Sequence, residues 1–151
     1  MTIKVICMGS GQMGIAAPQE VIQRPELELV GLHAYSGWKA GMDAADIING
    51  AKELVGSIDE AKKLGFDPGT PLEKTGILAT CSFEDILAMD ADLVIYTTLG
   101  AGEDLSENDE QVKALLRSGK NVITPTGYTF PWAHGDDFAK GFEDACKEGN
   151  S

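Results

Sequence analysis

Basic residues are scarce in this 151-residue chain. Twelve Lys and Arg stand against 24 Asp and Glu, which gives a formal net charge of −12. A nucleic-acid surface needs clustered Lys and Arg to neutralise phosphates, so the composition argues against a nucleic-acid partner. The net charge instead predicts a solvated, acidic exterior.

Long apolar runs are also missing. The longest, around Leu93–Tyr96, is far short of the roughly 20 residues that a membrane-spanning helix needs. The opening apolar run, Ile3–Met8, leads directly into glycines, and neither its length nor its flanks fit a signal peptide. We therefore expect no membrane partner and a cytoplasmic location.

Cysteine and histidine are both scarce, at three and two residues. Cys7, Cys81 and Cys146 show no paired ligand spacing, and an odd number of cysteines in a reducing compartment predicts free thiols. The histidines are His33 and His134. We expect no metal site, and the pattern singles out no catalytic residue.

Strand-like apolar runs alternate with helical stretches along the chain. The expected strands are Ile3–Met8, Leu27–Tyr35, Ile77–Thr80, Ala91–Thr98 and Asn121–Thr124. The expected helices run from the first glycines to about Arg24, then over about Ala40–Asn49, Ser57–Leu64, Ser82–Met89, Glu107–Arg117 and Gly135–Lys147. Helical connections between strands imply right-handed crossovers and a parallel sheet. The order predicts one α/β domain over residues 1–151, a Rossmann-type, doubly wound, mainly parallel sheet with helices on both faces.

Three local signals refine these expected helices. Pro18 removes a backbone hydrogen bond, so the first helix should bend or start late. Ser82 opens a capping box in which Asp85 replaces the usual Glu. Gly119 follows an expected helix end, where glycine readily takes the left-handed conformation.

A glycine loop is the strongest functional signal. It has the form G-x-G-x-x-G and comprises Gly9, Ser10, Gly11, Gln12, Met13 and Gly14. It lies directly after the first expected strand and opens the first helix, the context that distinguishes a dinucleotide loop from chance glycines. Gly9 would permit the tight turn, Gly11 the approach of a pyrophosphate, and Gly14 close helix packing. Unpaired N–H groups and the helix dipole would then face the phosphates; the alternative is a plain strand–helix turn.

The end of the second expected strand bears on the choice of cofactor. NAD sites usually place a carboxylate there to bind the ribose 2′-hydroxyl, and this chain has none between His33 and Lys39. Ser36 can donate a hydrogen bond and Lys39 can pair with a 2′-phosphate, which favours NADP(H), with NAD(H) possible. Lys39 could equally be a solvated loop residue. His33, inside a strand, is interpreted as a packed core histidine rather than a catalytic one.

The loops after the fourth and fifth expected strands should line the nicotinamide side. Ligands of open α/β sheets bind outside the carboxyl ends of the strands, and Thr97, Thr98, Thr126 and Gly127 lie there. The alternative is turn chemistry alone. An acidic run follows the fourth strand and contains Glu103, Asp104, Glu107, Asp109 and Glu110. Such a run usually marks a helix N-terminus favoured by the dipole, although one carboxylate, with Glu107 the first choice, could bind an ammonium or act as acid or base.

Several segments together carry a family resemblance. They are the glycine loop, Arg24–Gly31, Tyr35-Ser36 with Lys39–Asp43, Gly119–Ile123, and Thr126–Tyr128. In this order and spacing they resemble the N-terminal domain of the dihydrodipicolinate reductase-like superfamily, and within it 2,4-diaminopentanoate dehydrogenase and related amine dehydrogenases. The resemblance covers nearly the whole chain except Gly50–Lys74.

The resemblance implies hydride transfer between NAD(P)H and an imine or iminium carbon of a small-molecule substrate. It also implies that an α+β domain follows this one, holds most of the substrate and mediates oligomer contacts, so a homo-oligomer is possible. The His-His…Lys signature of dihydrodipicolinate reductases is not present in this sequence, and no catalytic residue is carried over.

Two other functions remain open. Sugar-type oxidoreductases related to glucose-fructose oxidoreductase share this opening, but they usually carry Glu-Lys-Pro where this chain has Thr124-Pro125-Thr126. A stand-alone NAD(P)-binding or sensing module without catalysis is the other alternative.

Overall fold

A computed structural model describes residues 2–11, 14–54, 71–98, 105–125, 127–128 and 130–151. The strands are β1 (Ile3–Met8), β2 (Leu27–His33), β3 (Leu93–Tyr96) and β4 (Asn121–Ile123). The helices are α1 (Ala16–Gln23), α2 (Ala44–Leu54), α4 (Phe83–Ala88), α5 (Ser106–Arg117) and α6 (Asp136–Gly149), with short 3-10 turns η1 (Gly37–Lys39) and η2 (Pro131–His134). Side chains of residues 51–54 lie outside this description, and so does the helix expected over Ser57–Leu64.

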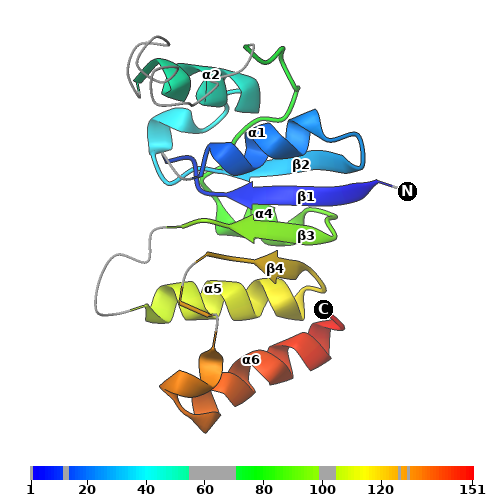
Figure 1. The fold of residues 1–151 in the computed structure, drawn as a ribbon, viewed down its shortest axis with the longest axis vertical. Coiled ribbons are helices and arrows are strands. Elements are labelled where there is room, and N and C mark those ends of the chain that lie inside the picture. Colours follow the sequence, from blue (N-terminus) through cyan, green and yellow to red (C-terminus); the bar gives the residue numbers. More distant parts are fainter. Residues whose placement is uncertain (1, 12–13, 55–70, 99–104, 126, 129) are drawn as a thin grey trace.

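The four strands form one sheet in the order β2-β1-β3-β4, and every neighbouring pair is parallel. Because all strands point the same way, their carboxyl ends meet at a single edge, which lies on the left in Figure 1. The expected α/β architecture is confirmed: this is a Rossmann-like fold.

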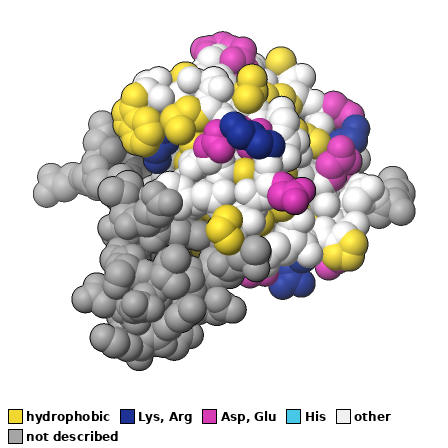
Figure 2. Space-filling view, turned by 90° about the horizontal axis from the view of Figure 1, so that it is seen from above, with side chains coloured by type: hydrophobic (Ala, Val, Ile, Leu, Met, Phe, Trp, Pro, Cys, Tyr) yellow, Lys and Arg dark blue, Asp and Glu magenta, His cyan; other side chains and the backbone are white. Residues whose placement is uncertain are grey.

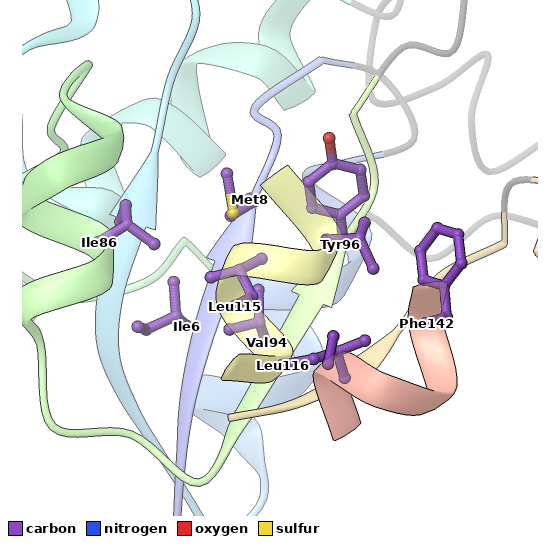
Figure 3. Close-up of a cluster of buried hydrophobic side chains, with 10 residues drawn as sticks. Ile6, Met8, Ile86, Val94, Tyr96, Leu115, Leu116 and Phe142 are labelled. Atoms are coloured by element: carbon purple, nitrogen blue, oxygen red, sulfur yellow. The ribbon is translucent and has the colours of Figure 1, made fainter. Parts of the chain in front are cut away.

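Side chains of β1 alternate between two cores, one on each face of the sheet. Val5 and Cys7 pack with α1 and α2, whereas Ile6 and Met8 pack with α4, α5 and α6. The second core includes Tyr96 and Leu115, both fully buried (Figure 3). Because both faces of β1 are covered from Val5 onward, its residues Val5–Met8 form a continuous apolar run rather than an alternating one.

The prediction of a strand over Ile77–Thr80 is wrong, because this segment forms isolated bridges instead of a strand. Thr80 makes one parallel bridge to His33, whereas Leu78 pairs antiparallel with Asp43. The Asp43 carboxylate accepts hydrogen bonds from the backbone N–H groups of Thr75 (3.1 Å) and Gly76 (2.8 Å), and these bonds hold the segment against the start of α2. The chain therefore reaches the edge of β2 only at Thr80.

Asp43 also explains why α2 begins later than expected. Its carboxylate accepts a hydrogen bond from the N–H of Ala45 at 2.8 Å, which makes Asp43 the N-cap of a helix that starts at Ala44 rather than at Ala40. The residues before it instead form η1 and a backbone pairing with the segment that carries Ala79.

Two of the three local signals agree with the structure, and the capping box at Ser82 is only half formed. Helix α1 starts late, at Ala16, so that Pro18 falls within its first turn, where the lost N–H has no helical partner. Ser82 caps α4 by accepting from the N–H of Asp85 at 3.1 Å. The Asp85 carboxylate does not close the box; it accepts from the hydroxyl of Thr80 at 2.7 Å. Gly119 has a φ of +85°, as expected after α5.

Surface charges are mixed. On the face drawn in Figure 2, the described Lys and Arg side chains are separated by acidic and neutral ones and form no continuous basic patch. No helix within the described ranges is long and apolar enough to cross a membrane.

Candidate functional site

The glycine loop lies where β1 gives way to α1, at the carboxyl edge of the sheet. Gly9 has a φ of +114°, a conformation that L side chains rarely adopt. A Cβ on Gly9 would lie 2.7 Å from Oγ1 and 2.8 Å from the carbonyl oxygen of Thr97, and a Cβ on Gly14 would lie 2.5 Å from the carbonyl oxygen of Gly9. Both glycines are therefore required by the protein's own packing.

Gly11 differs from its two neighbours. A Cβ at this position would meet no atom of the described residues within 4 Å, and its φ is not in the left-handed region. Packing within the described part of the chain therefore does not require glycine here. What glycine leaves open is the approach of another molecule to the backbone, as a diphosphate needs. Gln12 and Met13, the other loop residues predicted to bind the cofactor, lie outside the described residues.

The side chain of Lys39 contacts the glycine loop at Ser10. Its Nζ donates to the carbonyl oxygen of Ser10 at 2.6 Å and lies 3.2 Å from the Ser10 hydroxyl. Lys39 belongs to η1, which Ala34–Ser36 connect to the end of β2, and Ser10 is largely buried. An ammonium carries three N–H donors, so this contact places a positive charge beside the loop and leaves one donor for a ligand. Both residues are among the predicted site residues, whereas their contact, across 29 positions of the chain, has no signal in the sequence.

Ser36 lies at the start of η1. Its backbone carbonyl accepts from the N–H of Lys39 at 2.9 Å and from the thiol of Cys81 at 3.7 Å, and its side chain makes no capping bond to η1. The predicted residues Ser10, Ser36 and Lys39 thus share one corner, although 26 to 29 positions separate Ser10 from the other two.

His33 is packed, as the sequence analysis expected. It is 4% exposed at the end of β2, and its ring meets that of Tyr35 edge-on at 4.8 Å. Burial lowers the pKa of the imidazole, opposed by a hydrogen bond to the Cys81 backbone. A neutral, buried ring of this kind suits a core position rather than acid–base chemistry.

The two threonines after β3 are both engaged within the protein. The Thr97 hydroxyl donates to the carbonyl of Met8 at 2.9 Å, and the Thr97 N–H donates to the same oxygen at 2.8 Å. Thr98, 4% exposed, accepts from Nδ2 of Asn108 at 2.9 Å. These bonds tie the end of β3 to β1 and to the first turn of α5.

A polar network behind Thr98 was not foreseen. The buried Tyr96 hydroxyl donates to Gln111 at 2.9 Å and accepts from Asn108 at 3.0 Å. Tyr35, two residues beyond the end of β2, lies next to this network. Burial of its hydroxyl and then the nearby Tyr96 hydroxyl raise the pKa of Tyr35 to about 12. Nothing in sequence spacing pairs Asn108, which stands within an acidic run, with a strand tyrosine.

The loop after β4 borders a cavity of about 300 Å³. The residues that line it come from this loop, the start of α5 and the η2–α6 region: Gly127, Tyr128, Leu105, Ser106, Asp109, His134 and Phe138. The Tyr128 hydroxyl donates to Asp109 at 2.7 Å, and burial followed by this carboxylate raises the pKa of Tyr128. Of the two residues predicted here, Gly127 lines the cavity and Thr126 lies outside the described residues.

The acidic run divides in the structure. Glu103 and Asp104 lie outside the described residues. Glu107 and Asp109 occupy the first turn of α5, where the helix dipole favours carboxylates. Glu110 pairs with Lys113 at 2.9 Å. Among the described residues, no group of three or more His, Cys, Asp and Glu is placed to hold a metal ion.

Comparison with known proteins finds likeness in structure alone. No protein-family model and no curated protein matches the chain. Among solved structures, an amine dehydrogenase from Mycobacterium smegmatis matches with a TM-score of 0.73 and 17% identity, covering 99% of this chain and 37% of the other. An NAD-binding protein from Listeria innocua matches with a TM-score of 0.60 and 16% identity over 100% and 34% of the two chains.

A third match is biliverdin reductase from Synechocystis, solved with biliverdin and NADP+. Its TM-score is 0.56 at 14% identity, over 95% of this chain and 35% of that one. At these identities the comparisons show a shared fold. The chain spans about a third of the length of each of these three structures.

Proposed function

We propose that this chain is the dinucleotide-binding domain of an NAD(P)-dependent oxidoreductase. The observation that carries the proposal is the glycine loop at the β1–α1 junction, in which Gly9 and Gly14 are needed for packing while Gly11 leaves the backbone open. The first turn of α1 contains no acidic residue that would repel a phosphate. Solved structures of the same fold include one with NADP+ bound and one described as NAD-binding.

We further propose a preference for NADP(H) over NAD(H). No carboxylate follows β2 to bind a ribose 2′-hydroxyl and repel a 2′-phosphate. The ammonium of Lys39 lies instead beside Ser10, within hydrogen-bonding distance of the loop that would hold the diphosphate. Ser36 would donate a hydrogen bond to the same ribose.

The substrate class we propose is an imine or its amine. This rests on the sequence resemblance to amine dehydrogenases and on the amine dehydrogenase among the structural matches. The bound nicotinamide would supply the hydride that reduces the imine carbon. The chain's own part would be to hold the diphosphate at the glycine loop and to place the nicotinamide near Thr98 and Gly127. A further domain would hold most of the substrate.

Calorimetric titration of the purified chain with NADPH and NADH tests the proposal. We expect NADPH to bind more tightly than NADH. Lys39→Gln should weaken the affinity for NADPH by roughly tenfold or more and change the affinity for NADH little, because a charge-assisted hydrogen bond contributes about 1.5–3 kcal/mol. Lys140→Gln is the matched control, since it removes the same charge from α6, where Lys140 pairs with Asp144. Equal affinities for the two nucleotides would refute the NADP(H) preference, and no binding of either would refute the function.

A further inference from the structure

Trp38 is an unusually exposed aromatic residue. It lies in the middle of η1, with 69% of its surface exposed, the largest value among the exposed large hydrophobic side chains of the described residues. Leaving an indole in water forgoes the burial that large aromatic side chains usually obtain. The turn that carries it begins directly after Ser36, three residues beyond the end of β2.

The position of Trp38 is tied to the glycine loop through its neighbour. Nζ of Lys39 lies over the Trp38 ring, 5.3 Å from its centroid, and the same Nζ donates to the Ser10 carbonyl at 2.6 Å. The indole, the ammonium and the loop backbone therefore form one contiguous group. The cation covers part of one face, and the high exposure leaves indole surface available to a ligand.

The end of the second strand is where the adenosine ribose of a dinucleotide lies in this fold. A base attached to that ribose needs a flat apolar partner, and every base offers a π-face to an aromatic side chain. The ammonium between indole and loop would meet the ribose 2′-phosphate. The indole would thus meet the adenine and the ammonium the 2′-phosphate, and both of these groups belong to the adenosine half of NADP(H).

We propose that Trp38 is the platform on which the adenine ring of the dinucleotide stacks, and that Trp38 and Lys39 together form a 2′-phosphoadenosine subsite. The inference rests on the proposed function, since it needs a dinucleotide at the glycine loop. It adds the residue that binds the base and predicts that the adenosine half alone is recognised.

Tryptophan fluorescence can test the contact directly. The chain has two tryptophans, Trp38 and Trp132, so Trp132→Phe leaves Trp38 as the sole reporter. In that variant we expect adenosine 2′,5′-bisphosphate to quench the emission with saturation, and nicotinamide mononucleotide at the same concentrations to leave it unchanged. In the reciprocal variant, Trp38→Phe, we expect little quenching by adenosine 2′,5′-bisphosphate.

Affinity measurements separate the stack from the rest of the site. Trp38→Ala should lower the affinity for NADPH by about tenfold or more, in line with the effect of removing a base-stacking side chain. Trp38→Phe, which keeps an aromatic ring, should retain most of that affinity. Because Trp38 is exposed, thermal midpoints should match the parent chain. Trp132→Ala, at a residue that is also exposed (52%) but lies in η2, should bind NADPH as the parent does.

Two failures would be distinguishable. If the parent chain binds NADPH while Trp38→Ala binds it equally well, or if the bisphosphate leaves Trp38 fluorescence unchanged at saturation, the stacking proposal is wrong and the proposed function stands. If the parent chain binds no dinucleotide, both fall. An indole that serves instead to contact another protein would give the first of these results.

Discussion

At the scale of single residues, the three cysteines differ sharply in environment. Cys7 lies in β1 with 1% of its surface exposed, and burial raises the pKa of its thiol to about 12. Cys146 is half-buried on α6, and Cys81 is exposed beside the carbonyl of Ser36. Reactivity follows access and thiolate content, so these environments predict three different rates of modification.

We expect Ellman's reagent to modify Cys81 first and Cys7 only when the chain unfolds. Cys81→Ser should therefore remove the fastest phase of colour development in the native protein, and Cys7→Ser should leave that phase unchanged. A fast phase that survives in Cys81→Ser would show that the exposed thiol has been assigned wrongly.

At the scale of elements, Asp43 joins two segments that are distant in sequence. Its carboxylate is 6% exposed and accepts from the N–H groups of Ala45, Thr75 and Gly76 and from the hydroxyl of Thr75. Burial alone would raise its pKa, but these hydrogen bonds together outweigh it, so the pKa is lowered. One charged side chain thereby caps α2 and fixes the segment that leads to Thr80.

Asp43→Asn should lower the free energy of unfolding by about 1–3 kcal/mol at pH 7, because buried N–H groups lose an acceptor. A carboxyl whose pKa is lowered by folding stabilises the protein above the pKa of the unfolded chain, and this contribution is lost as the pH falls through the folded value. The difference between parent and variant should therefore narrow between pH 7 and pH 3 in urea unfolding.

Asp46→Asn is the control for this experiment. Asp46 lies in the same helix and pairs with Lys74 at the surface. Its substitution should therefore change the free energy of unfolding by no more than about 0.5 kcal/mol. If the free energies of unfolding of the parent and Asp43→Asn differ by the same amount at pH 7 and pH 3, the Asp43 carboxylate is not the charged acceptor described above.

The elements were foreseen best where local sequence decides them. The carboxyl end of β1 follows from a buried apolar run, Val5–Met8, that stops before Gly9, and the end of α5 follows from Gly119. The expected strand over Ile77–Thr80 was wrong because its partner was set by bonds from Asp43, more than 30 positions away. Local apolar character predicts that such a segment is extended, but it says neither which neighbour the segment pairs with nor that Leu78 would be 58% exposed.

The candidate site shows the same division. The glycine loop and Lys39 were both singled out from sequence, because turn geometry and charge are local properties. Their contact through Ser10, and the bonds among Tyr96, Thr98 and Asn108, join different elements and depend on how the strands are ordered. These could be known only once the fold was assembled.

At the scale of the whole molecule, α6 closes the second core by lying along α5. Phe142 packs between Tyr128 and Phe138, with ring centroids 5.3 and 5.0 Å apart. At the end of the helix, Gly149 approaches α5 so closely that a Cβ would lie 1.8 Å from the carbonyl oxygen of Leu116. Position 149 in the last turn of α6 therefore tolerates only glycine in this arrangement.

Gly149→Ala should destabilise the protein by about 1–3 kcal/mol, the usual cost of forcing an extra group into a packed contact. Gly141→Ala is a matched control in the same helix: its Cβ would meet only the end of the Lys113 side chain at 3.4 Å, and alanine is the better helix former. Thermal unfolding should thus lower the midpoint for the first variant and leave or raise it for the second. Equal shifts in both would mean that α6 does not dock on α5 through this contact.

Cofactor binding of the proposed kind requires a diphosphate to lie against the backbone at Gly11. The most direct measurement is calorimetric titration of Gly11→Val with NADPH, beside Gly50→Val in α2, where a Cβ likewise meets no described atom within 4 Å. We expect both variants to fold with the parent's circular dichroism, Gly50→Val to bind as the parent does, and Gly11→Val to lose binding by at least a hundredfold. Undiminished affinity in folded Gly11→Val would contradict the central claim.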